Sequence, residues 1–157
     1  MYGVDAEVIA PLRAPTELRI AESAWRRILS DVVSSFPIEA CGVLLGHVEG
    51  HIALVREAKR LRNILASNRA FWFDVAEWMS AILEGRERGL EYIGVYHSHP
   101  REDPILSLSD RQRMLECPGE VWLVVGYLPG REPKAAAWVI RGYGLGVDRV
   151  RVTIGNV

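Results

Sequence analysis

The segment EYIGVY, residues 91–96, runs directly into HSHP, residues 97–100, and this junction restricts the fold more than any other feature of the chain. A short segment rich in aromatic and β-branched residues predicts a buried strand, which Pro100 would end. Side chains two positions apart on a strand project to the same face. His97 and His99 can therefore point at one ion while Ser98 points away from it. The fold must then place a site at the end of this strand.

The chain after the two histidines can supply a third ligand. The loop REDPIL, residues 101–106, is long enough for the chain to return and place Asp110 in the first turn of a following helix. Two imidazoles and one carboxylate, with a fourth position left for water, are typical of a catalytic zinc site, whereas structural sites are usually closed by four side chains. The nitrogen and oxygen ligands favour zinc.

Each half of this pattern also has a structural interpretation. A His-x-His pair occurs by chance on surface strands, and SLSD, residues 107–110, fits a helix N-cap. The chain has only 4 histidines, and two of them at the end of an apolar strand, followed by Ser-x-x-Asp, favour a metal site. The order of the residues disfavours a non-haem iron triad. His47 and His51 flank a predicted hairpin turn, and we expect both to be solvated.

The remaining periodicities predict one α/β domain, a mixed sheet with flanking helices. Asp74 and Glu77 have the spacing of a capping box at the start of the second helix. Residues 1–16 are interpreted as an N-terminal extension with a short strand around residues 7–10, and residues 17–157 as the domain. We expect strands at 17–20, 41–48, 51–58, 69–73, 91–96, 121–127, 135–141 and 146–154, and helices at about 25–36, 75–83 and 107–116.

Length and composition limit the classes of function. A chain of 157 residues can bury a core without disulfides, and its two cysteines are too few for a disulfide framework. With 19 basic and 20 acidic residues and a pI near 6.4, nothing favours nucleic acid or an anionic membrane as a partner, so a polymeric substrate is expected to be protein. No apolar run approaches the roughly 18 to 20 residues that cross a bilayer, and the charged N-terminus is unlike a signal peptide. A cytoplasmic location is expected.

A zinc hydrolase also needs a general base, ideally a carboxylate that does not itself bind the metal. Glu39 is our candidate. It follows Pro37, between the amphipathic helix and the apolar strand CGVLLG, at a position where an acid has no packing role. The alternative is an exposed loop carboxylate, and the sequence by itself leaves both open.

Taken together, EACGVLLG, YHSHP and SLSD resemble the JAMM (MPN-plus) zinc metalloproteases. That family includes deubiquitinating enzymes of the proteasome lid and signalosome, and prokaryotic relatives that act on ubiquitin-like sulfur carriers. Its pattern of an upstream Glu, His-Ser/Thr-His-Pro and Ser-x-x-Asp, with ten residues between the second His and the Asp, is met in full. The resemblance covers about residues 17–154, including Asn63 and RAFWFD, and implies a cytidine-deaminase-like JAMM/MPN fold.

The resemblance implies a role for each matching residue. His97, His99 and Asp110 correspond to the zinc ligands. Glu39 corresponds to the base that activates water and later protonates the leaving amine, and Ser107 to the serine whose hydroxyl supports the oxyanion.

Two further residues of the matching motifs are given smaller roles. Ser98 is interpreted as a residue that supports or packs behind the ligands. Cys41 is interpreted as a small buried residue, and pairing with Cys117 is left open.

The segments in which eukaryotic deubiquitinases carry long insertions are short here, which disfavours eukaryotic ubiquitin as substrate. The resemblance therefore implies a free-standing prokaryotic zinc-dependent isopeptidase or peptidase that hydrolyses the bond following the C-terminal tail of a ubiquitin-like or sulfur-carrier protein. Release of a small amino acid such as cysteine from a sulfur carrier is an alternative. A non-catalytic MPN scaffold is another, which the intact ligand set disfavours. The sequence leaves a homo-oligomer open.

Overall fold

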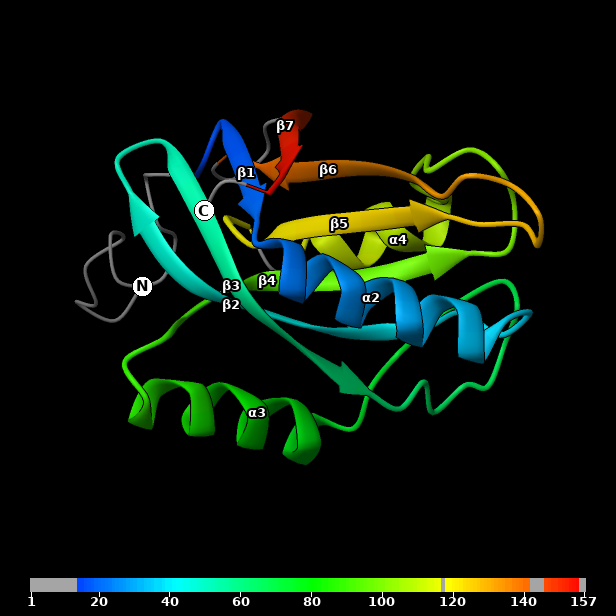
Figure 1. Cartoon of the computed structure of the whole chain (residues 1–157), viewed down its shortest axis with the longest axis horizontal. Coiled ribbons are helices and arrows are strands. Elements are labelled where there is room, and N and C mark those ends of the chain that lie inside the picture. Colours follow the sequence, from blue (N-terminus) through cyan, green and yellow to red (C-terminus); the bar gives the residue numbers. More distant parts are fainter. Residues whose placement is uncertain (1–13, 117, 142–145, 156–157) are drawn as a thin grey trace.

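The computed structural model describes residues 14–116, 118–141 and 146–155. Within these residues it confirms the predicted single-domain α/β architecture, with seven strands in one sheet and three helices against it (Figure 1). In chain order the elements are β1 (Glu17–Ile20), α2 (Glu22–Ser35), β2 (Cys41–Glu49), β3 (Ile52–Leu61), α3 (Val75–Glu87), β4 (Glu91–His99), α4 (Leu108–Met114), β5 (Val121–Gly126), β6 (Lys134–Ile140) and β7 (Val147–Ile154).

The sheet is a closed barrel with the strand order β1-β3-β2-β4-β5-β6-β7. It closes because the short strand β1 pairs in parallel with both β3 and β7. The predicted hairpin of β2 and β3 is confirmed, and its turn contains Gly50 at φ +61°, a conformation that glycine adopts readily. β4 lies between antiparallel β2 and parallel β5, so the strand that carries the histidines is central in the sheet.

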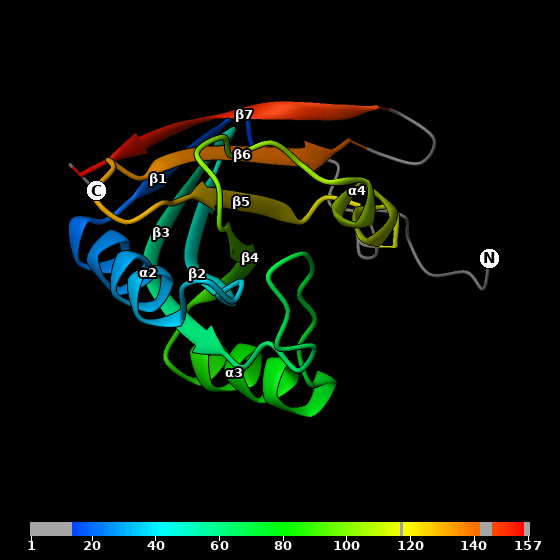
Figure 2. The same cartoon turned by 90° about the vertical axis from the view of Figure 1, so that its right-hand side faces the viewer.

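Two apolar clusters form the core, one on each face of the sheet. The first takes side chains from all seven strands and from α2, including Ile28 and Val32 at the helical spacing seen in the sequence. The second lies on the other face of β2, β4 and β5, under Phe71, Phe73, α3 and α4, and Figure 2 shows α2 and α4 on opposite sides of the sheet. Alternation along β4 sends Tyr96 into the first cluster and Val95 into the second.

A buried hydrogen bond joins α2 to β4 directly before the histidines. The Tyr96 hydroxyl donates to Asp31 Oδ2 at 2.8 Å, and the other carboxylate oxygen of Asp31 pairs with Arg60 Nε at 3.1 Å. Burial is the largest influence on this carboxyl and raises its pKa, while the hydrogen bond from Tyr96 and the charge of Arg60 oppose that effect. This network fixes α2 against the strand that carries the site.

The predicted strand at residues 69–73 is wrong. These residues are irregular, because their backbone groups bond to a neighbouring loop instead of a strand. Asn63 accepts from Trp72 N–H at 3.3 Å and donates to the Ala70 carbonyl at 3.0 Å, while Ile64 N–H donates to the Trp72 carbonyl at 2.8 Å. The apolar side chains of this segment are buried in the second cluster, which explains its strand-like composition.

The capping box predicted at the start of α3 is only half present. Asp74 caps the helix as expected, accepting from Ala76 N–H at 2.8 Å and Glu77 N–H at 3.3 Å. Glu77 does not return to the N-cap, because its carboxylate accepts from Arg62 N–H at 3.0 Å. It therefore joins the end of β3 to α3.

Some sequence predictions lie partly or wholly outside the described residues. The strand around residues 7–10 and Cys117 are among these, so the N-terminal extension and the pairing of Cys41 stay predictions. Cys41 itself is buried, as predicted. Arg141 donates to the carbonyl oxygens of Ala14 at 2.7 Å and Pro15 at 2.9 Å, which attaches the start of the described chain to the sheet. No helix among the described residues is long and apolar enough to span a membrane.

Candidate metal centre and active site

His97 and His99 lie at the carboxyl end of β4, which extends through both residues. Their exposed fractions are 0% and 1%, and their Nε2 atoms are 3.0 Å apart. The period of two along a strand therefore places both imidazoles on one face, as predicted. Ser98 points to the opposite side, where its hydroxyl accepts from Ala40 N–H at 2.8 Å.

Asp110 lies in the first turn of α4 and returns to both histidines. Its Oδ2 atom is 3.1 Å from Nε2 of His97 and 3.1 Å from Nε2 of His99. The same oxygen accepts from Ser107 N–H at 2.9 Å, and the Ser107 hydroxyl accepts from Asp110 N–H at 3.0 Å. Ser107 and Asp110 therefore form a capping box at the same time as Asp110 joins the cluster. The two interpretations of SLSD are compatible.

Glu39 lies two residues before β2 and is 1% exposed, which excludes the alternative of an exposed loop carboxylate. One donor atom each from Glu39, His97 and His99 lie within 4.8 Å of one another. Among the described residues, neither carboxylate oxygen of Glu39 has a hydrogen-bond partner. A buried carboxylate without partners is costly, so a group that binds or reacts with it is expected at this position.

All five predicted site residues are thus brought together from three separate parts of the chain. The cluster of Glu39, His97 and His99 could hold a metal ion, and Asp110 adds a further oxygen. Imidazole nitrogens and carboxylate oxygens are the donors that zinc takes from proteins at catalytic sites, so the residues present fit that ion.

The model of one protein family, the prokaryotic homologs of the JAB domain, matches residues 21–141, which include the whole cluster. The chain belongs to this prokaryotic JAB family. The JAB match thus covers the expected JAMM/MPN motifs and confirms the resemblance seen in the sequence.

Two curated relatives support the same assignment. A desampylase of Pyrococcus furiosus is 34% identical over 116 residues, which cover 74% of this JAB-family chain and 76% of the relative. A desampylase of Haloferax volcanii is 37% identical over 89 residues, 56% of this chain and 62% of that relative.

Solved structures share the JAB fold. A protein of Desulfitobacterium hafniense has a TM-score of 0.79 at 24% identity, covering 89% of this chain and 94% of that one. A JAB1/MPN domain protein of Archaeoglobus fulgidus has a TM-score of 0.58 at 18% identity, covering 88% and 99%. At these identities the comparison concerns the fold alone.

The two carboxyl groups of the JAB site have pKa values shifted in opposite directions. Burial, and then the charge of Asp110, raises the pKa of Glu39 from 4.5 to about 8. Burial also acts to raise the pKa of Asp110, but the charge of His97, the contacts of His97 and His99 with the carboxylate and the Ser107 N–H outweigh it and hold that pKa well below its ordinary value. Burial lowers the pKa of His97, and the charge and hydrogen bond of Asp110 oppose that effect.

Aromatic rings hold one imidazole of the JAB site in place. The ring of Phe71 stacks on His97, and the ring of Trp122 meets His97 edge-on at a centroid distance of 5.6 Å. Phe71 belongs to the segment that we had predicted as a strand, so its contact with the site was missed. The RAFWF composition was the only signal for it.

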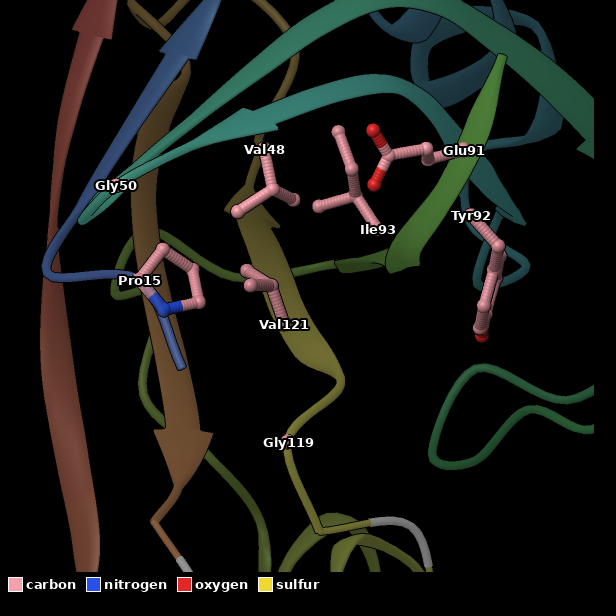
Figure 3. A pocket seen from close by; sticks show the side chains of 8 residues that line it. All are labelled: Pro15, Val48, Gly50, Glu91, Tyr92, Ile93, Gly119 and Val121. Atoms are coloured by element: carbon pink, nitrogen blue, oxygen red, sulfur yellow. The ribbon is translucent and has the colours of Figure 1, made fainter. Parts of the chain in front are cut away.

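Two cavities of the JAB domain lie in different places relative to this site. The one drawn in Figure 3 has a volume of about 290 Å³ and lies at the amino ends of β4 and β5, between Ile93, Val121 and Val48. His97 and His99 are at the carboxyl end of β4, so this cavity does not contain them. A smaller cavity of about 220 Å³ borders Glu39 and Asn63 and is next to the candidate active site.

Proposed function

We propose that the protein is a zinc-dependent hydrolase that cleaves the bond following the C-terminal tail of a ubiquitin-like protein. The observation that carries this proposal is the convergence of His97, His99 and Asp110 beside a buried Glu39 whose carboxylate has no partner among the described residues. Both curated relatives bear the name desampylase, which implies a hydrolase that acts on a ubiquitin-like modifier. Membership of the JAB family supports carrying that activity over.

The opposite pKa shifts support different roles for the two carboxyl groups. Asp110 keeps its negative charge, and its Oδ2 atom accepts from Ser107 N–H and lies 3.1 Å from Nε2 of each histidine, which suits a metal ligand. Glu39 has a pKa of about 8, close to neutrality, where a group can both accept and donate a proton. We therefore assign the ion to His97, His99 and Asp110, and proton transfer to Glu39.

Zinc held by these three side chains would supply Lewis acidity, polarising the scissile carbonyl and making water more acidic. Glu39 accepts a proton from the attacking water as the new C–O bond forms. The C–N bond then breaks, and Glu39 gives its proton to the departing nitrogen. One carboxyl group thus serves both steps, and its burial excludes solvent protons from the transfer.

Ser107 is placed to assist the same reaction. Its oxygen accepts from Asp110 N–H, which leaves the hydroxyl hydrogen free to donate. We propose that it donates to the carbonyl oxygen of the scissile bond as negative charge develops there.

Replacement of the base tests the proposal. Glu39→Gln retains the shape of the side chain but cannot accept the proton, so hydrolysis should fall by roughly 10³- to 10⁴-fold with zinc content unchanged. The substrates would be a panel of ubiquitin-like proteins joined at the C-terminus to a lysine side chain, a peptide or a single amino acid. Glu49→Gln, an exposed carboxylate at the far end of β2, is the matched control and should keep the wild-type rate. Wild-type protein with full zinc and no activity on any conjugate would favour a non-catalytic scaffold.

One observation favours the release of a single amino acid as a second candidate activity. Arg101 follows the HSHP motif, is exposed, and its guanidinium has no ion pair among the described residues. Its charge reaches Glu39, where it partly opposes the rise in pKa caused by burial and Asp110. The α-carboxylate of a free amino acid lies two bonds from its amine, so Arg101 could bind it while Glu39 protonates that amine. A lysine within a protein has no carboxylate there.

The same substrate panel distinguishes the two leaving groups. If Arg101 binds a carboxylate, Arg101→Gln should raise KM for the single-amino-acid conjugate about tenfold or more and leave KM for its carboxamide analogue and for the lysine conjugate unchanged. Equal effects on all three conjugates would assign Arg101 to general electrostatics and leave the isopeptidase as the better proposal.

A further inference from the structure

Glu39 is not held by the sheet, although the proposed reaction needs it at a fixed distance from the histidines. The ladder between β2 and β4 begins with Cys41 opposite His97. Glu39 precedes this first pair by two residues, so no regular strand pairing positions its backbone.

One side chain, Asn63, takes up part of this task and uses its whole hydrogen-bonding capacity. Its Nδ2 atom donates to the carbonyl oxygens of Glu39 and Ala70, both at 3.0 Å. Its Oδ1 atom accepts from Leu65 N–H at 3.1 Å and Trp72 N–H at 3.3 Å. Ala70 and Trp72 are the two neighbours of Phe71, the residue stacked on His97. A single amide therefore contacts the backbone of the proposed base and both sides of the residue that packs on a proposed ligand.

The Glu39 N–H and both backbone groups of Ala40 also form hydrogen bonds with residues outside the regular pairing of β2. Glu39 N–H donates to the Ser67 carbonyl at 2.9 Å, in the same loop as Asn63. Ala40 is held on both sides by Ser98, whose hydroxyl accepts from Ala40 N–H at 2.8 Å and whose N–H donates to the Ala40 carbonyl at 3.0 Å. Ser98 lies between the two histidines, so this pair of bonds ties the base directly to the strand that carries them.

We propose that Asn63 and Ser98 are positioning residues that together hold Glu39 at its working distance from His97 and His99. This rests on the proposed function, in which Glu39 transfers the proton. Asn63 fixes the carbonyl side of Glu39 relative to the loop at residues 63–72, and Ser98 fixes the following residue relative to β4. The serine between the two histidines of the His-Ser-His motif is thereby assigned the role of fixing the backbone next to the base.

The two residues can be altered selectively. Asn63→Asp keeps the acceptor atoms for Leu65 and Trp72 and removes the two donors, including the one to Glu39. Ser98→Ala removes the acceptor for Ala40 N–H. Asp74→Ala is a matched control, because it removes two hydrogen bonds at the cap of α3, on the same connection between β3 and α3, without contacting Glu39.

The first measurement needs no activity. In the zinc-free protein, amide hydrogen exchange followed by NMR should be about tenfold or more faster at Glu39 in Asn63→Asp, and at Ala40 in Ser98→Ala. Exchange at Val43, inside β2, should be unchanged in both variants, and Asp74→Ala should leave the Glu39 and Ala40 amides as in the wild type. The proposal would be overturned if the Glu39 amide in Asn63→Asp and the Ala40 amide in Ser98→Ala exchanged at the same rates as in the wild-type protein.

The second measurement separates positioning from general stability. Each variant should keep its zinc and its KM, while kcat falls roughly 10- to 100-fold, because displacement of a reacting group by about 1 Å costs this much. In the Glu39→Gln background the same substitutions should cause little further loss, since they act through the carboxylate that is already missing. Fully additive losses would overturn the proposal. If Glu39→Gln itself remains active, the proposed function fails, while the exchange data still report on the contacts.

Discussion

The rings of Phe71 and His97 are stacked, with centroids 4.3 Å apart and planes inclined by 21°. Phe71 comes from an irregular segment and His97 from the central strand, so the contact joins two parts of the chain that share no backbone pairing. Trp122 meets the same imidazole edge-on from β5. The orientation of His97 is therefore fixed by packing on two sides.

Phe71→Ala should weaken zinc binding as well as the fold. Removing a buried phenylalanine typically costs about 3–5 kcal/mol of unfolding free energy. Here it also removes the ring that packs on one face of His97, so this imidazole is held less firmly in the orientation that binds the metal. Phe73→Ala is the control, because Phe73 is buried in the same cluster but stacks on Trp72 instead of the histidine. Chemical denaturation and competition with a chelator would measure the two quantities. Equal zinc affinities in the two variants would contradict a positioning role for the Phe71 ring.

The purified protein should bind about one zinc ion per chain, measurable by elemental analysis. His97→Ala and Asp110→Ala should each lose it, because each removes one of three converging donors. His47→Ala is the control, since His47 lies on β2 away from the cluster, and it should keep the metal. The fold should survive the loss of zinc, because two apolar clusters form the core without it. Full occupancy in both ligand variants would place the ion elsewhere.

Ser107→Ala should affect stability and catalysis through separate interactions. Loss of the N-cap should cost about 1 kcal/mol of unfolding free energy, and loss of the hydroxyl donor should lower kcat on the order of 10²-fold. Ser107→Asn separates the two, because asparagine caps helices well but has no hydroxyl. It should be nearly as stable as the wild type and as slow as the alanine variant. If Ser107→Asn kept the wild-type rate, Ser107 would act only as the N-cap of α4 and not in catalysis.

The stability of the zinc-free protein should depend on pH through Glu39. Burial, followed by the charge of Asp110, raises its pKa from 4.5 to about 8 in the folded state. Between these values the folded protein keeps a proton that the unfolded chain has released, so the unfolding free energy should fall as pH rises, by up to about 1.4 kcal/mol per pH unit. Glu39→Gln should lack this slope. Denaturation curves of the two proteins from pH 5 to 8 would measure it, and a constant difference between them would contradict the burial of an uncompensated carboxyl.

Much of the fold and of the site was predictable because the signals are local. Helical spacing located α2, and two apolar runs around Glu49 and Gly50 located the hairpin of β2 and β3. The period of two on β4 placed His97 and His99 on one face, and the capping box at Ser107 is likewise a relation between residues three positions apart. Such patterns depend on backbone geometry within a few residues, and tertiary packing did not alter them.

Other features depended on partners far away in the chain. The strand predicted at residues 69–73 does not form, because the side chain of Asn63 and the adjacent loop satisfy its backbone groups. Closure of the barrel requires β1 to pair with both β3 and β7, which no local pattern indicates.

The sequence by itself determined most of the helices and strands of this protein, though not the irregular segment at residues 69–73, and the identity of the residues that could form a metal site. Only the tertiary structure decided the state of Glu39, because its burial and its raised pKa arise from packing against segments distant in the chain. The hydrogen bond from Ala40 N–H to the Ser98 hydroxyl, for example, joins residues 58 positions apart. A carboxyl group becomes a proton carrier near neutral pH only when the folded chain removes it from water, and that environment exists only in the assembled barrel.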